Sequence, residues 1–102
     1  MKIEVLYVPN CPNHAVALHR LREALTVEKL QPQVNEVLVR DAAAASSLEF
    51  PGSPTIRVNG HDVESSNAPS FGLMCRLYSD GRGAPSFRSL RAAIQKARQS
   101  ET

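Results

Sequence analysis

Two residues one helical turn apart, Cys11 and His14, carry the clearest chemistry in the sequence, in a Pro-Asn-Cys-Pro-Asn-His segment at residues 9–14. The segment stands between a predicted strand and a predicted helix, where the backbone N–H groups of a helix start stabilise a thiolate. An imidazolium at His14 would stabilise that thiolate further, and a neutral imidazole could relay a proton. The chemistry expected here is nucleophilic attack by the Cys11 sulfur. The alternative interpretation is a buried, inert cysteine beside a surface histidine.

The second cysteine, Cys75, lies in a Gly-Leu-Met-Cys-Arg-Leu-Tyr segment at residues 72–78. The loop that carries it could fold back toward the strand ends and bring it near Cys11. It would then act as a distant resolving thiol, or it would pair with Cys11 to hold a soft metal ion such as Cu(I) or Hg(II). The favoured interpretation of Cys75 by itself is a buried small apolar residue between Met74 and Leu77.

The elements that must position these thiols are predicted in the order β-α-β-α-β-β-α. Residues 2–8 alternate and then become continuously apolar, which is typical of a central strand covered on both faces. Apolar residues at helical spacing predict a helix over 12–30, with Pro12 in its first turn. The other predicted elements are a strand at 34–39, a helix at 41–48 with Asp41 as its N-cap, a strand at 55–58, an Asn59-Gly60 turn, a returning strand at 61–63 and a helix at 85–98 with Ser86 as a possible cap. Residues 64–83 are predicted to be mainly loop.

Composition limits the class of protein. The 102 residues are 42% hydrophobic and 22% charged, which suits a single domain spanning 1–102. Two cysteines are too few for a disulfide scaffold or an all-cysteine zinc site. No apolar run approaches the roughly 20 residues of a membrane span. The first residues do not resemble a secretory signal, so we expect a cytoplasmic protein without a membrane partner.

The net charge of +2 is uneven, since residues 76–102 carry six basic and two acidic side chains. In the last predicted helix, Arg88, Arg91 and Arg98 form a basic stripe beside an apolar stripe that begins at Phe87. Binding of a nucleic acid would need aromatic residues among these cations for stacking on the bases, and only 5% of the chain is aromatic. The stripe is therefore expected to be a solvated face, with no nucleic-acid partner. His19 and His61 are likewise expected to be solvated.

The order of elements and the spacing from Cys11 to Ser53-Pro54 resemble the thioredoxin-like fold. In that family a cysteine motif opens the first helix, and a cis-proline before the third strand lies against it. The resemblance implies a central mixed sheet flanked by helices, a cis Ser53-Pro54 bond, and a substrate groove formed by Pro12, Ser53, Pro54 and Thr55. His14 stands where the second motif cysteine is usual, and the tryptophan often found before the motif is absent. Cys11 can therefore attack a disulfide but has no local thiol to resolve the product, unlike a general disulfide reductase.

A further resemblance concerns the Gly-Ser-Pro-Thr and Cys-Arg-Leu-Tyr segments at 52–55 and 75–78. With the Cys-Pro opening, they are similar to short bacterial sequences described as alkylmercury-lyase-like. True organomercurial lyases cleave the carbon–mercury bond with two cysteines and an aspartate. This chain supplies Cys11 and Cys75, and the sequence does not place Asp41, Asp62 or Asp80 beside them.

Three functions follow from these residues. The favoured one is a monothiol oxidoreductase without a cofactor, in which Cys11, His14 and Cys75 act on a small thiol or on a protein thiol or disulfide. The second is a protein that binds a soft metal ion or an organomercurial between Cys11 and Cys75. The third is a thioredoxin-like scaffold that binds a protein partner and performs no chemistry.

Overall fold

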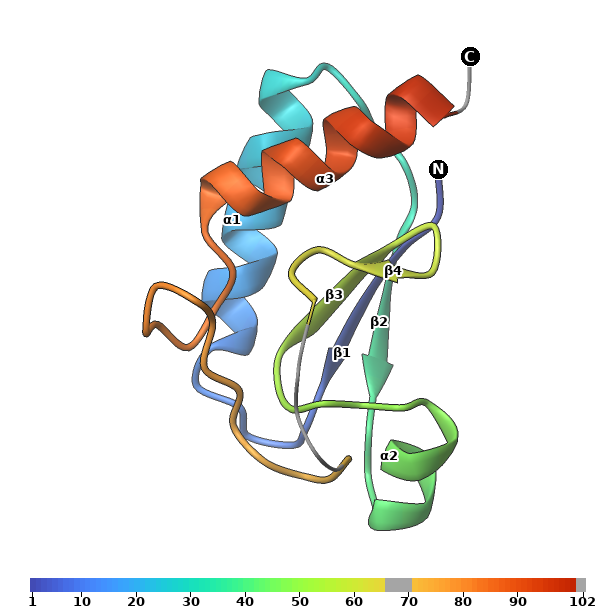
Figure 1. Ribbon diagram of the computed structural model, residues 1–102, viewed down its shortest axis with the longest axis vertical. Helices are drawn as coiled ribbons and strands as arrows, with labels where there is room; N and C mark the ends of the chain where they lie inside the picture. Colours follow the sequence, from blue (N-terminus) through green and yellow to red (C-terminus); the bar gives the residue numbers. More distant parts are fainter. Residues whose placement is uncertain (66–70, 101–102) are drawn as a thin grey trace.

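The computed structural model describes residues 1–65 and 71–100, and its elements follow the predicted β-α-β-α-β-β-α order (Figure 1). The elements are β1 (Ile3–Tyr7), α1 (His14–Val27), β2 (Val34–Leu38), α2 (Ala42–Ser47), β3 (Thr55–Val58), β4 (His61–Asp62) and α3 (Phe87–Ser100). Among these helices, none is both long enough and apolar enough to cross a bilayer.

The four strands form one mixed sheet in the order β2-β1-β3-β4. β1 runs parallel to β2 and antiparallel to β3, and β4 returns antiparallel to β3. The predicted central strand is therefore confirmed, since β1 has a hydrogen-bonded neighbour on each side. The register pairs Leu6 with Thr55, so the end of β1 and the start of β3 meet at the same edge of the sheet.

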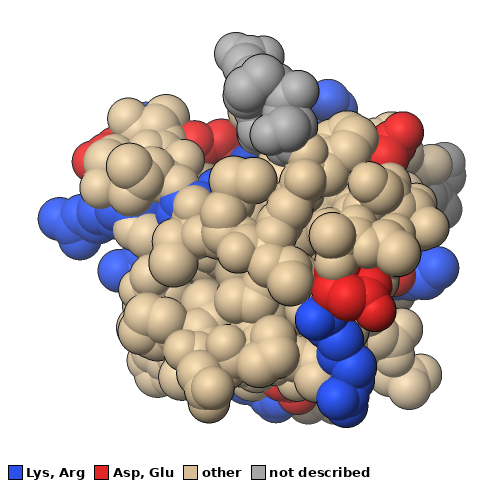
Figure 2. All heavy atoms as spheres, turned by 90° about the horizontal axis from the view of Figure 1, so that it is seen from below, with Lys and Arg blue, Asp and Glu red and all other residues tan. Residues whose placement is uncertain are grey.

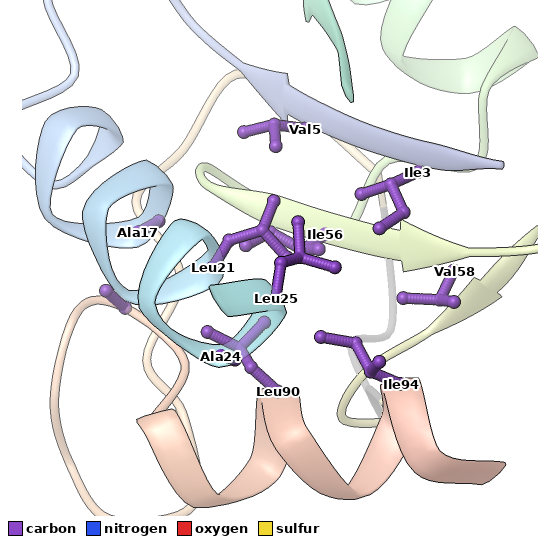
Figure 3. Close-up of a cluster of buried hydrophobic side chains, with 11 residues drawn as sticks. Ile3, Val5, Ala17, Leu21, Ala24, Leu25, Ile56, Val58, Leu90 and Ile94 are labelled. Atoms are coloured by element: carbon purple, nitrogen blue, oxygen red, sulfur yellow. The ribbon is translucent and has the colours of Figure 1, made fainter. Parts of the chain in front are cut away.

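Helices cover both faces of this sheet. α1 and α3 pack on one face, where Ile3 and Val5 of β1 meet Leu21 of α1 and Leu90 and Ile94 of α3 (Figure 3). The opposite face carries a smaller cluster of Leu6, Val39, Ala45 and Phe50, to which α2 contributes. Alternate residues of β1 thus enter different clusters, which is why its apolar run is continuous. Burying each large aliphatic side chain contributes about 1.5–3 kcal/mol.

Local signals in the sequence place several boundaries correctly. Asp41 caps α2, because its Oδ1 accepts a hydrogen bond of 2.8 Å from the Ala44 N–H. Asn59 and Gly60 both have positive φ angles, 53° and 83°, as a two-residue hairpin turn with a type I′ twist requires. Ser86 Oγ accepts a hydrogen bond of 3.1 Å from the Ser89 N–H at the start of α3.

Two helix starts differ from the prediction. α1 begins at His14, so Pro12 lies in the turn before the helix and not in its first turn. The reason is that residues 9–13 are used to turn the chain away from β1, with Asn10 in the left-handed region at a φ of 61°. α3 begins at Phe87, two residues later than predicted, and Phe87 is exposed instead of lying in the apolar stripe with Leu90 and Ile94.

The basic stripe on α3 is exposed as predicted, and two of its arginines also contact a buried carboxylate. Glu28, just after α1, is buried at 9% exposure and lies within ion-pair distance of two arginines of α3. Arg91 Nε is 2.7 Å from one carboxylate oxygen and Arg98 Nη1 is 3.2 Å from the other. The Arg91 hydrogen bond lowers the pKa of Glu28, burial opposes that shift, and Gln95 and the charge of Arg98 reinforce it. The stripe therefore joins α3 to the end of α1.

Candidate functional site

The candidate site lies where β1 ends and β3 begins, at the lower end of the molecule in Figure 1. Cys11 lies in the connection from β1 to α1 and is partly buried. The Ser53-Pro54 bond immediately before β3 is cis, as the resemblance implies. Ser53 is tied to the end of β1, because the Val8 N–H donates a hydrogen bond of 3.0 Å to Ser53 Oγ. The segments that carry the thiol and the proline are thus fastened at one edge of the sheet.

Cys11 stands two residues before the N-cap Asn13, further from the helix than the sequence predicts. Its carbonyl accepts a hydrogen bond of 3.3 Å from the His14 N–H, which closes the turn into α1. The first-turn N–H groups begin only at His14, so the helix start acts on Cys11 from a greater distance than the sequence suggested.

The imidazole of His14 is held between two strands. It stacks on the ring of Tyr7, with centroids 3.8 Å apart and planes within 5° of parallel. Its Nε2 atom lies 2.9 Å from Glu36 Oε1 on β2, but this buried nitrogen makes no hydrogen bond of normal geometry in the described part of the chain. The contact is therefore an ionic one when the ring is protonated. The sequence analysis did not identify Tyr7 or Glu36 as partners of His14, because no local sequence pattern indicates either contact.

Cys75 lies on a segment that pairs with the residue before the cis-proline. The Ser53 N–H donates to the Met74 carbonyl at 2.8 Å, and the Arg76 N–H donates to the Ser53 carbonyl at 3.0 Å, which forms a parallel bridge between Ser53 and Cys75. Cys75 is exposed, so the favoured interpretation of it as a buried apolar residue is wrong. The loop does fold back to the strand ends, as a resolving thiol would require. Both cysteines are free thiols.

The same bridge requires a glycine at position 52. A Cβ atom on Gly52 would lie 3.0 Å from Arg76 Cβ and 3.3 Å from the Met74 carbonyl oxygen. The φ angle of Gly52 is +135°, which side chains rarely tolerate. Close backbone approach at this point brings residues 74–76 against the segment that contains the proline.

A buried arginine holds this loop in place, and sequence reasoning missed it. Arg76 is only 6% exposed. Its Nη1 donates to Thr55 Oγ1 at 3.1 Å and to Asp62 Oδ2 at 2.7 Å, and its Nη2 donates to the Glu64 carbonyl. The guanidinium also lies over the ring of Tyr78, 4.4 Å from its centroid. Asp62 is therefore committed to Arg76.

Tyr78 connects the loop to the proline segment. Its hydroxyl donates to the carbonyl of Pro54, and the ring is buried at 4% exposure. Burial raises the pKa of Tyr78 strongly; Arg76 lowers it, and the charges of Asp62, Glu64 and Cys11 raise it further. The hydroxyl therefore stays protonated and acts as a hydrogen-bond donor.

Burial alternates along residues 75–78 in a way that the sequence does not signal. Arg76 and Tyr78 face inward, whereas Cys75 and Leu77 are exposed, as in a short strand. Alternation of polarity would predict the opposite faces, with the apolar Cys75 and Leu77 inward and the charged Arg76 outward.

The two other histidines and the potential metal ligands complete the set of candidate residues. His19 is exposed and lies 3.3 Å from Glu23 one turn later, and His61 is exposed at the start of β4, so both are solvated as predicted. Within residues 1–65 and 71–100, no group of three or more histidine, cysteine, aspartate or glutamate side chains could hold a metal ion. Cys11 and Cys75 alone would supply two ligands, fewer than such a group.

The surface at this end of the molecule is uncharged at its centre, with lysine, arginine, aspartate and glutamate at its margins (Figure 2). Large apolar side chains around Cys75 are exposed, namely Phe71, Leu73, Met74 and Leu77. Leu77 is the most exposed of them at 76%. The exposed thiol of Cys75, among apolar side chains, and the partly buried thiol of Cys11 are thus in different environments. Comparison with protein-family models, curated proteins and solved structures finds no match for the chain.

Proposed function

We propose that this chain is a thioredoxin-like protein that uses Cys11 as the nucleophile of thiol–disulfide exchange. The observation that carries the proposal is that Cys11, which follows β1, and the Ser53-Pro54 segment, which precedes β3, meet at one edge of the sheet, where the Val8 N–H donates to Ser53 Oγ. The sheet order β2-β1-β3-β4, with α1 and α3 on one face and α2 on the other, supports the same fold.

The step balances without a cofactor. The Cys11 thiolate attacks one sulfur of a substrate disulfide, the S–S bond breaks, and the second substrate sulfur leaves as a thiolate that takes up a proton. A new disulfide joins Cys11 to the first substrate sulfur. A second thiol then attacks this mixed disulfide, releases the first substrate sulfur and becomes oxidised in turn. The substrate disulfide is reduced, and the two attacking thiols supply the electrons.

Of the four residues expected to form the substrate groove, Pro12, Ser53, Pro54 and Thr55, only Pro12 is exposed enough to touch a substrate. The other three support the groove from beneath the surface. Ser53, Pro54 and Thr55 are buried in the chain as it stands, and loop 74–78 fixes them through backbone and side-chain hydrogen bonds. A rigid segment beside the nucleophile lowers the entropic cost of aligning a disulfide for attack.

His14 and Cys75 take supporting roles in this proposal. His14, stacked on Tyr7, holds the first turn of α1 against β1 and so sets the direction in which the chain leaves Cys11. Cys75 is the candidate resolving thiol, because its segment is hydrogen-bonded to Ser53 and its sulfur is accessible. A protein that works through free thiols suits the reducing cytoplasm.

The test compares the two thiols within one chain. Cys75 is exposed and Cys11 is partly buried, so accessibility alone predicts that Cys75 reacts faster with a neutral disulfide such as bis(2-hydroxyethyl) disulfide. The proposal predicts the reverse order. Mixed-disulfide formation is followed by intact-mass spectrometry at neutral pH in Cys11→Ser and Cys75→Ser, each of which retains one thiol. Faster reaction of the Cys11→Ser variant, whose only thiol is Cys75, would overturn the proposal.

A second function is favoured by the apolar side chains around Cys75. Four of them are exposed on one short loop, an arrangement that suits a protein partner more than a charged small disulfide. If the chain is a binding module without chemistry, Cys11→Ser retains full function in a cell that depends on the protein, whereas Leu77→Asp loses it. Loss of function in Cys11→Ser, with the fold intact, argues against the binding module.

A further inference from the structure

A cleft of about 650 Å³ opens between α3 and the β3–β4 hairpin. It adjoins Val58, the last residue of β3, whereas the candidate thiol site adjoins the first, so the two sites lie at opposite ends of that strand. The volume is within the range of about 300–1,000 Å³ found for small-molecule sites. Nothing in the thiol chemistry requires this cleft.

The cleft has an apolar floor that is continuous with the core. Val58 is buried, and Val63 and Ala93 pack against the same cluster while lining the cleft. Figure 3 shows Val58 and Ile94 at this end of the core, with Ile94 reaching from α3 toward the sheet. Small residues on the helix wall leave the space open, because α3 presents alanines here where larger side chains would reach the hairpin.

The charges at the cleft favour an anion. Asp62 lines it, but this carboxylate is neutralised by Arg76 at 2.7 Å. Lys96 lines the opposite wall and is exposed, and its ammonium has no ion-pair partner in the described part of the chain. His61 lines the hairpin wall and is exposed, so its ring N–H is accessible as a second donor. Lys96 is thus the one charged side chain of the lining without a described counter-ion.

We propose that this cleft binds an amphipathic anion, a molecule with a flat or chain-like apolar body and one carboxylate, sulfonate or phosphate group. The apolar body lies on Val58, Val63 and Ala93, and the anionic group is bound by Lys96 with His61 as a hydrogen-bond donor. This site is independent of Cys11, so its failure leaves the proposed thiol function untouched.

The experiment uses the full chain and two fluorescent probes that differ in charge. The first is 8-anilinonaphthalene-1-sulfonate, an amphipathic anion, and the second is its neutral counterpart, N-phenyl-1-naphthylamine. Fluorescence titration gives the affinities, and amide chemical shifts locate the probe. We expect the anion to bind with shifts confined to residues 58–65 and 89–100. A Kd weaker than about 1 mM, or shifts centred elsewhere, overturns the proposal.

Two variants and a control separate the parts of the site. Lys96→Gln should weaken the anionic probe by about threefold to fivefold, a modest factor because the lysine is exposed, and leave the neutral probe unchanged. Ala93→Leu fills the floor and should weaken both probes, with its folding checked by circular dichroism. Lys29→Gln removes the same charge beyond the end of α1, outside the cleft, and should change neither affinity. Equal effects of Lys96→Gln and Lys29→Gln on the anionic probe refute the assignment.

Discussion

Replacing Tyr78 with phenylalanine tests whether loop 74–78 fixes the proline segment. The change removes one hydroxyl and keeps the buried ring and its contact with Arg76. The Pro54 carbonyl, which this hydroxyl bonds, belongs to a fully buried residue and loses its donor. A buried acceptor without a partner costs about 1–3 kcal/mol. For a domain of this size, each kcal/mol corresponds to roughly 4–8 °C, so the melting temperature should fall by roughly 4–24 °C.

Tyr7, the other tyrosine of the sequence, provides a matched control. Tyr7→Phe also removes a phenol hydroxyl and keeps the ring that stacks on His14, and no hydrogen bond of the Tyr7 hydroxyl is recorded in the described residues. We expect Tyr7→Phe to stay within about 0.5 kcal/mol of the parent chain. Urea unfolding and thermal unfolding, both followed by far-ultraviolet circular dichroism, give the two values.

Equal stability of the two tyrosine variants would contradict this role of the Tyr78 hydroxyl. That result would mean that water or a shifted backbone satisfies the Pro54 carbonyl at little cost, and that the Tyr78 hydroxyl does not hold the proline segment. A large loss in Tyr78→Phe with an unchanged slope of the urea transition supports the clamp, since the slope reports the surface exposed on unfolding.

Three further predictions concern charge, backbone and metal. The pKa of Glu28 is lowered in the folded chain, chiefly by Arg91. Its contribution to stability is therefore present above the unfolded pKa of about 4.3 and is lost as the pH falls through the folded pKa. Glu28→Gln should flatten the acid side of a plot of melting temperature against pH. Gly52→Ala should destabilise the chain by about 2 kcal/mol in urea unfolding, because its φ is strained and its new Cβ would meet Arg76. Gly60→Ala carries the φ penalty alone, since its Cβ would meet no atom within 4 Å, and should lower the free energy of unfolding by less. If Cys11 and Cys75 share a soft metal ion, native mass spectrometry should show one Hg(II) bound more tightly than in Cys75→Ser; equal binding excludes the two-thiol site.

Much of the fold could be predicted because its signals are local. The continuous apolar run before Pro9 identifies the central strand, and Asn59-Gly60 identifies the hairpin from the φ angles that its turn requires. Asp41 marks the start of α2 by the oxygen it offers to a backbone N–H. Each of these depends on neighbours within a few residues, so the sequence contains the whole cause.

The start of α1 and the arginine contacts of α3 were not predicted because they depend on tertiary packing. Helical spacing extends back to Pro12, but the chain needs residues 9–13 to turn from β1 onto the face of the sheet, so α1 starts at His14. The basic stripe of α3 is exposed as its composition predicts, but only the packing of α3 across the end of α1 brings Arg91 and Arg98 to Glu28.

The sequence by itself determined the order of the elements, the position of Cys11 between β1 and α1, and the chemical possibilities of two thiols. Only the tertiary structure decided what surrounds them: His14 turned toward Tyr7 and Glu36, Cys75 exposed beside Ser53, and Arg76 and Tyr78 buried against the proline segment. The physical reason is range. Strand, turn and cap signals act between neighbouring residues, whereas a buried arginine or phenol is stable only where partners from distant segments satisfy its polar atoms.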